Sequence, residues 1–281
     1  MTLVPEQINL LPSNLSKNNF QTQAELTMNK LITLILLSLF ASFFTLWYRT
    51  NKIDKPAVSK DNILLVGTNS EYAPFSFMEN NQIVGFDIDL VTEIAKVMGK
   101  TLELQDMPFD ALIPAMQTGQ LQVIATGITP TQKRALQVNF TKPYLKGDPL
   151  LIVSPEATPI KTVDELKDKK VAVNEGFTAD YYMSAIKGPQ LVRFASPIES
   201  FMALASGRID ALVAAENNVK PFLNHYGANK FSVANIPDTT DEYALALSKK
   251  YPELVAEIQQ AIDTLQENGT LDTLKQKWKL N

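Results

Sequence analysis

Short apolar runs alternate with helical patterns along the chain from Asn62 onward. The runs "ILLVG" (63–67) and "LQVIATGI" (121–128) have the length of strands. Between them, "GFDIDLVTEIAKVMG" (85–99) places apolar residues at helical spacing and closes with a glycine. Because strands that alternate with helices are typical of parallel sheets, the pattern predicts an α/β architecture.

One helix–glycine–strand unit occurs twice. Phe109–Ala125 and Ile198–Ala214 each contain an acidic residue, a helical apolar face, a glycine (Gly119 or Gly207) and then a strand. Any unit of this type has the same outline, so coincidence is one interpretation. The other is that the protein consists of two similar α/β lobes, for which the roughly 220 residues after position 60 are about the right length.

The N-terminal residues differ from the rest in composition. Residues 1–27 are rich in Asn, Gln and Ser, which indicates a segment that is disordered or not translated. Residues 28–60 begin with "MNK", continue into the uncharged apolar run Leu31–Tyr48 and end in a linker. That run fits either a signal peptide or an uncleaved membrane anchor, and both alternatives stay open. The positive-inside rule alone would place the C-terminal side in the cytoplasm, because more basic residues follow the run than precede it.

Composition removes several classes of function. The chain has 281 residues and a net charge of −4, so no electrostatic argument favours nucleic acid as a partner. It has no cysteine, which excludes disulfides and zinc–thiolate sites. The single histidine, His225, lies at a predicted helix end, where a surface role is expected. We therefore expect neither a metal nor a cofactor.

The stretch "TGITPTQKR" (126–134) carries the first candidate site. Thr129, Pro130 and Gln132 fit the N-cap, N1 and N3 positions of a helix. Arg134 would then lie near the positive end of that helix, where a cation is unfavourable unless an anion binds beside it. Such an anion would be a carboxylate held by the planar guanidinium. The alternative is that Arg134 pairs with a neighbouring acid or faces water.

Other candidates lie at similar strand ends, where open α/β sheets bind ligands. Thr126 offers a hydroxyl beside Arg134, and Gly127 allows a ligand close to the backbone. Thr178 follows the strand in "VAVNEGFTAD" (171–180) and is either a ligand contact or an ordinary helix cap. Tyr72 and Phe109, in predicted loop positions, are candidates to flank an apolar stem.

Several motifs together resemble one family. "GTNSEYAPFSF", "GFDIDLVTEIAKVMG", "FDALIPAMQTGQLQVIATGITPTQKR", "FTKPYL", "GRIDAL" and "NGTLDTLKQKW" occur in the order and spacing of the family 3 solute-binding proteins. Members of that family are the amino-acid receptors of ABC importers. The resemblance covers about Ile63 to Trp278 and implies the periplasmic-binding-protein type II fold, in which two α/β lobes are joined by a hinge of two crossings.

The resemblance also implies roles for the candidate residues. Arg134 would hold the α-carboxylate of the ligand, helped by Gly127, Thr129 and Thr178. Asn69 would contact the ligand side chain or amine, while Tyr72 and Phe109 would flank the stem.

One position departs from the family pattern. Many members end the "GRIDAL" strand with an aspartate that binds the α-amine, but the corresponding residue here is Ala215. Glu216 is the nearest acid and would reach the amine if the strand end carried a one-residue bulge. The segment most resembles the arginine-binding branch, so arginine is the first expectation, ahead of glutamine and other polar amino acids.

The resemblance implies lobe boundaries at 61–147 with 244–281 for the first lobe and 148–243 for the second. The hinge crossings are expected near Leu145–Pro149 and Asp238–Tyr243. We expect a periplasmic monomer that delivers a free L-amino acid to an ABC importer permease, anchored to the inner membrane if the apolar run is uncleaved. The alternatives are an enzyme on the same fold, dehydratase-like or active on murein, and the sensor domain of a signalling receptor.

Overall fold

The computed structural model describes residues 28, 36–38, 40–43 and 62–280. The chain divides into two compact units, Met1–Ala57 and Val58–Asn281. In the first unit, residues 36–38 and 40–43 are helical, and their apolar side chains are exposed. No helix among the described residues combines the length and hydropathy that a membrane span requires. The predicted run Leu31–Tyr48 lies largely outside the described residues, so its role as a signal or anchor stays a prediction.

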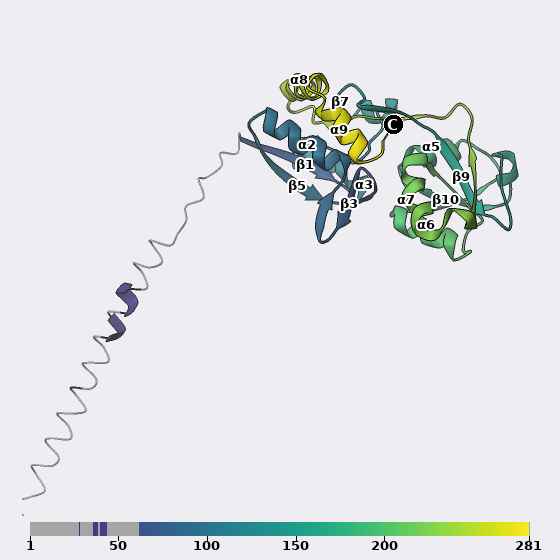
Figure 1. The fold of residues 1–281 in the computed structure, drawn as a ribbon, viewed down its shortest axis with the longest axis horizontal. Coiled ribbons are helices and arrows are strands. Elements are labelled where there is room, and N and C mark those ends of the chain that lie inside the picture. The colour runs from purple at the N-terminus through teal and green to yellow at the C-terminus, as the bar shows by residue number, and fades with distance from the viewer. Residues whose placement is uncertain (1–27, 29–35, 39, 44–61, 281) are drawn as a thin grey trace, which may run out of the picture. The chain divides into compact units, whose positions relative to one another are not determined.

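The second unit contains two five-stranded sheets (Figure 1). We call each sheet with its helices a lobe. The first sheet has the order β5-β1-β6-β15-β7. Its strands are β1 (Ile63–Thr68), β5 (Thr101–Asp106), β6 (Val123–Ile124), β7 (Asn139–Phe140) and β15 (Ala246–Leu247). The second sheet has the order β11-β10-β12-β9-β13. Its strands are β9 (Leu150–Pro155), β10 (Lys170–Asn174), β11 (Gln190–Phe194), β12 (Ala211–Ala215) and β13 (Phe231–Asn235).

The expectation of parallel sheets is correct only in part. β5, β1 and β6 run parallel, as do β11, β10 and β12. However, β15 pairs antiparallel with both of its neighbours, and so does β9. The reason is the way these strands are reached: both follow strands that pass between the sheets, whereas a parallel neighbour needs a crossover through a helix.

Two paired strands connect the lobes. β8 (Leu145–Asp148) leads out of the first sheet, and β14 (Asp241–Tyr243) leads back to it. They pair antiparallel, with a register shift between Asp241 and Glu242. Because the two strands bond to each other, the backbone groups that face across the pair are satisfied where the chain leaves the sheets.

Helices cover the faces of each sheet. The helices of the first lobe are α2 (Phe86–Val97), α3 (Phe109–Thr118), α4 (Gln132–Ala135), α8 (Glu253–Glu267) and α9 (Thr270–Lys277). The second lobe has α5 (Thr178–Ser184), α6 (Pro197–Ala205) and α7 (Glu216–Tyr226), with the 3₁₀ turns η2 (Asp164–Leu166) and η3 (Ala228–Lys230). A small sheet of β2 (Glu71–Tyr72), β3 (Ser76–Glu79) and β4 (Gln82–Val84) follows β1.

The last helices return to the first lobe. Lys277 Nζ and Trp278 Nε1 both donate to Asp89 Oδ2 on α2, at 2.7 Å each. Figure 1 shows α8 and α9 (yellow) beside α2, and α5, α6 and α7 around β9 and β10. The end of the chain therefore contributes to the lobe in which the folded unit begins.

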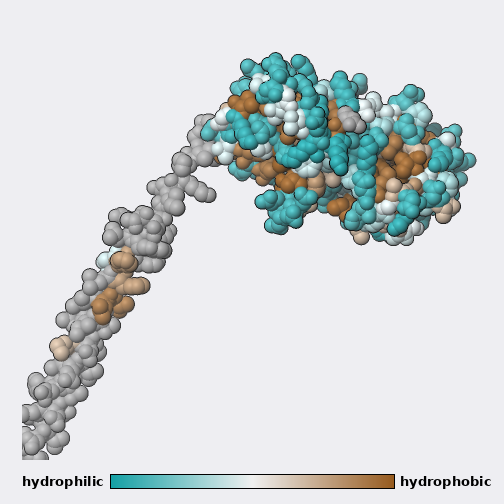
Figure 2. Space-filling model, in the orientation of Figure 1, coloured by the Kyte–Doolittle hydropathy of each residue, from teal (hydrophilic) through white to brown (hydrophobic). Residues whose placement is uncertain are grey.

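Each lobe buries two apolar clusters, one on either face of its sheet. In the first lobe, Leu64 and Val66 belong to one cluster and Leu121 and Ile124 to the other, and all four are fully buried. In the second lobe, Val171, Val173 and Val213 lie on one face, while Ala172 and Leu212 lie on the other. In the view of Figure 2, the visible face of the folded unit is mostly hydrophilic, with smaller apolar patches.

Candidate functional site

Arg134 is a buried cation, 4% exposed. Its Nη1 donates to the carbonyl oxygen of Thr129 at 2.7 Å, and its Nη2 donates to that of Gly176 at 3.0 Å. The guanidinium carbon lies 5.2 Å from the centre of the Phe109 ring. Since Gly176 precedes α5 in the second lobe, Arg134 joins the two lobes.

The local helix begins two residues later than predicted. Thr131, not Thr129, is the N-cap of α4, because its backbone is extended and its hydroxyl accepts from the N–H of Arg134 at 3.3 Å. The helix then has only four residues, so Arg134 lies in its last turn as well as its first. Arg134 is thus near the N-terminus of α4, as predicted, but in a helix of one turn it is equally near the C-terminus, so the helix dipole imposes no clear penalty on it. Burial is what makes this cation unusual.

The electrostatic environment of Arg134 favours an anion. Burial lowers the pKa of its guanidinium below the usual value, and the nearby Tyr181 and Asp241 oppose that shift. Among the described residues, Arg134 forms no salt bridge within 4.0 Å. Its two hydrogen-bond acceptors are uncharged carbonyls, so a carboxylate reaching this cation would gain a strong interaction.

The candidates beside Arg134 have different surroundings. Thr126 is fully buried, and its hydroxyl exchanges hydrogen bonds with the backbone of Asn69 at 3.1 and 3.2 Å. Two predicted residues are thus brought together at the ends of β1 and β6. The N–H of Gly127 donates to Asp87 Oδ2 at 2.6 Å, so that donor has an internal partner.

Asp87 anchors the loop that contains Gly127. It is fully buried near the start of α2 and also accepts from the Tyr144 hydroxyl at 2.6 Å. Burial raises the pKa of Asp87 to about 7, while the hydrogen bonds from Tyr144 and Gly127 act in the opposite direction. Asp87 therefore ties the loop beside Arg134 to a long helix of the first lobe.

Tyr72 and Phe109 both contact a third ring, which was not among the residues predicted from the sequence. Phe177, just before α5, has its ring centre 4.5 Å from that of Phe109 and 5.3 Å, edge-on, from that of Tyr72. The signal for it was an aromatic residue directly before Thr178 at a helix start. The three rings bring both lobes together around the Arg134 side chain.

The strand end at Glu216 differs from the expectation. β12 pairs with β9 in continuous register through Ala215↔Leu150, so the predicted bulge is absent. Ala215 ends the strand and Glu216 begins α7. The Glu216 side chain is 37% exposed and lies 3.4 Å from Lys220 Nζ, one helical turn later. Regular pairing of the strand makes this acid the first residue of α7, where it is partly exposed and contributes to the raised pKa of Asp148.

Two buried acids that sequence reasoning missed lie on the connecting strands. Asp241 accepts from the Thr178 hydroxyl at 2.6 Å and lies near Thr129. Asp148 accepts from the Tyr243 hydroxyl and from the N–H of Asn217. Burial raises the pKa of Asp148, and it raises that of Asp241 to about 6. In the sequence, both acids stand in short polar segments with the composition of exposed linkers.

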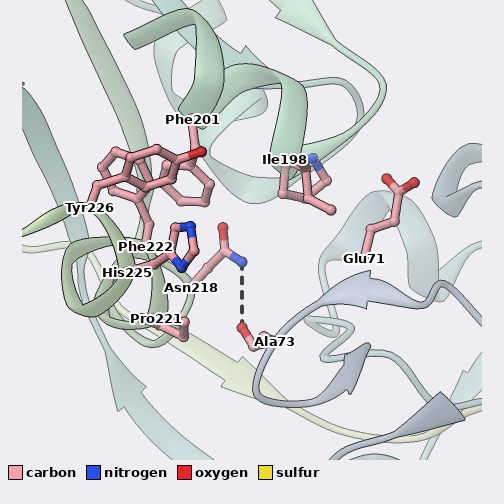
Figure 3. Close-up of a pocket in the computed structure, with 10 residues that line it drawn as sticks. Glu71, Ala73, Ile198, Phe201, Asn218, Pro221, Phe222, His225 and Tyr226 are labelled. Carbon is pink, nitrogen blue, oxygen red and sulfur yellow. Dashed lines mark hydrogen bonds between the residues drawn. The ribbon is translucent and has the colours of Figure 1, made fainter. Parts of the chain in front are cut away.

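Two cavities open between the lobes. One, of about 330 Å³, is lined by Asn69 and contains three carboxylates, Glu71, Asp106 and Glu199. The other, of about 240 Å³, has mostly apolar walls and none of the predicted site residues (Figure 3). At its edge the amide of Asn218 points toward Ala73 and donates to its carbonyl oxygen at 3.5 Å.

Comparison with known proteins gives a consistent result. The profile described as "Bacterial extracellular solute-binding proteins, family 3" matches residues 64–281. A probable histidine-binding protein of Campylobacter jejuni is 30% identical, covering 90% of this chain and 100% of its own length. The arginine-binding extracellular protein ArtP of Bacillus subtilis is 32% identical, covering 76% of this chain and 85% of its own length. The structure of an ancestral arginine-binding protein bound to arginine has a TM-score of 0.74 and 33% identity, covering 77% of this chain and 98% of that one.

Proposed function

Because the chain belongs to the bacterial extracellular solute-binding proteins of family 3, we propose that it captures L-arginine between its lobes and delivers it to an ABC importer permease. As a member of that family it has the periplasmic-binding-protein type II fold, and it is an amino-acid-binding component of an ABC transporter rather than an enzyme. In this proposal the first lobe comprises residues 61–147 and 244–281, and the second comprises residues 148–243. In this proposal the protein is exported to the periplasm or the cell exterior, in line with the names of relatives such as the extracellular protein ArtP.

The acidic cavity beside Asn69 is the observation that favours arginine as the ligand. Glu71 and Asp106 come from the first lobe and Glu199 from the second, and all three line the same space of about 330 Å³. Asp106 is held in place by hydrogen bonds from the N–H and hydroxyl of Ser70, at 2.9 and 2.6 Å. A long cationic side chain that extends past Asn69 would meet these carboxylates, whereas a glutamine side chain would gain no charge interaction.

The predicted ligand contacts fit one orientation. Arg134 takes the α-carboxylate with Thr129, Gly127 and Thr178 near it, while Thr126 holds Asn69 in place. Tyr72 and Phe109 flank the stem, with Phe177 as a third ring. Planar cations interact favourably with aromatic faces, which suits a guanidinium.

Histidine is the second candidate. The Campylobacter jejuni relative is a probable histidine-binding protein and matches over more of this chain than ArtP. An imidazole also stacks between rings, but it is largely neutral at pH 7.5 and gains less from three carboxylates. The receptor-sensor role remains a further alternative.

A thermal-shift screen of residues 58–281 against the twenty amino acids tests this function. That segment is a compact unit that contains all four apolar clusters. We expect arginine to give the largest rise in melting temperature, because a ligand at 100 times its Kd adds about 2.7 kcal/mol to stability. A larger shift with histidine would replace arginine by the second candidate. A screen without any shift would contradict amino-acid binding.

A further inference from the structure

The ammonium group of an amino-acid ligand lacks its expected partner at Ala215. An amino acid carries its ammonium and carboxylate groups on the same carbon atom. The acid that accepts the ammonium must therefore lie beside the cation that holds the carboxylate. Leaving an ammonium without a partner in a closed cleft would be costly.

Two acids compete for this role. Glu216, at the start of α7, is partly exposed and has Lys220 as its neighbour. Asp241 is only 5% exposed, its carboxylate is held by the hydroxyl of Thr178, and Thr129 lies near it. Those two threonines are residues we assign to the carboxylate end of the ligand, and Asp241 also interacts electrostatically with Arg134. Of the two acids, Asp241 is the one at the correct end of the ligand.

We propose that Asp241, on the connecting strand β14, accepts the α-ammonium group of the bound amino acid in place of an acid at the end of β12. This assignment rests on the proposed function, in which Arg134 holds the α-carboxylate. It adds the hinge strand to the ligand contacts of both lobes. Asp241 accepts a hydrogen bond from Thr178 of the second lobe and lies near Thr129 of the first, so it meets the ligand where the lobes come together.

The charge environment gives this assignment a pH signature. Burial and the neighbouring Asp148 raise the pKa of Asp241 to about 6, although hydrogen bonds and Arg134 act against them. A bound ammonium favours the charged carboxylate of Asp241. Protonation of Asp241 at low pH therefore competes with ligand binding. The other titratable or charged groups that face Asp241 are Arg134, Asp148, Tyr72 and Tyr243.

The test is calorimetry of residues 58–281 with L-arginine, L-histidine and their des-amino analogues, 5-guanidinopentanoate and imidazolepropionate. We expect Asp241→Asn to weaken binding of the amino acid by about 100-fold, as is typical when one partner of a buried charge pair is lost. Binding of the des-amino analogue should change less than threefold, which also shows that the variant is folded. The matched control is Glu242→Gln, the next acid on the same strand, which pairs with Lys146 at 3.6 Å.

Several results would overturn the assignment. Asp241→Asn with an affinity within threefold of wild type would do so, as would equal losses for the amino acid and its analogue. A large loss in Glu216→Gln without one in Asp241→Asn would return the role to Glu216. If the wild type binds neither amino acid, the proposed function fails and this assignment fails with it.

A second measurement needs no variant. The affinity of the wild type for its amino acid should fall as pH decreases below about 6, by up to tenfold per pH unit for one competing proton. Affinity for the des-amino analogue should not show this fall. An amino-acid affinity that is constant between pH 7.5 and 5 would contradict a role for Asp241.

Discussion

Arg134→Ala should cost about 3–5 kcal/mol of ligand binding, the largest effect expected from any single change in the site. A carboxylate enclosed between the lobes loses its water, and the guanidinium is its strongest replacement. Arg134 is itself buried, and its guanidinium bonds to uncharged carbonyls. Without this side chain, the carboxylate of the ligand would face only hydroxyls and N–H groups. Calorimetry of residues 58–281 with the preferred amino acid measures this loss.

The charge alone should not rescue binding. Arg134→Lys keeps a cation but loses the planar pair of donors, so it should also bind poorly. Arg208→Ala is the control, because that arginine is exposed and, among the described residues, its side chain bonds only to Ser206, at 3.3 Å. An Arg134→Ala protein with unchanged affinity would refute the carboxylate contact.

Gly127→Ala should destabilise the folded unit by about 3 kcal/mol, the second large effect. The backbone of Gly127 has a φ of +61°, where a side chain costs roughly 1–3 kcal/mol. An added Cβ would also lie 2.6 Å from Tyr72 Cε1 and 3.0 Å from Phe75 Cδ2, in a buried cluster where overpacking costs about 1–3 kcal/mol more. Ligand affinity should fall as well, because Tyr72 and the loop before Arg134 would have to move.

Gly207→Ala separates the two causes. Gly207 has a similar φ of +71°, but an added Cβ there meets no atom within 4 Å. Urea unfolding should therefore show a loss of only about 1 kcal/mol for this control, from backbone strain alone. Equal losses in the two variants would mean that contact with Tyr72 and Phe75 contributes nothing.

The fold was predictable where local patterns and the protein's architecture agree. The periodicity of 85–99 predicts α2, and the repeated helix–glycine–strand unit corresponds to α3 with β6 and to α6 with β12. The pairing of β9 and β15 was not predictable in the same way. Their direction depends on two strands that pass between the sheets, and this is a property of topology rather than of local sequence.

The site was predictable only where one residue type carries the chemistry. Arg134 stood out because of its type and its place at a strand end, even though the predicted N-cap was wrong. With threonines on both sides of Pro130, the sequence could not distinguish the two caps. The bond from Arg134 N–H to Thr131 decides between them.

The buried acids show the opposite case. Asp148 and Asp241 become buried only when β8 and β14 pair and the side chains of Tyr243 and Thr178 close over them. Such long-range contacts leave no periodic signal in a short polar segment. The same holds for Phe177, whose position between Tyr72 and Phe109 depends on how the lobes meet.

Calorimetry that compares each candidate amino acid with its decarboxylated form tests the central claim most directly. The pairs are L-arginine with agmatine and L-histidine with histamine, each titrated into residues 58–281 at pH 7.5. We predict that L-arginine binds at one site and that agmatine binds at least about 100-fold more weakly, because agmatine lacks the carboxylate that Arg134 holds. Equal affinity for the acid and the amine of a pair, or no binding of either amino acid, would contradict an amino-acid site built around Arg134.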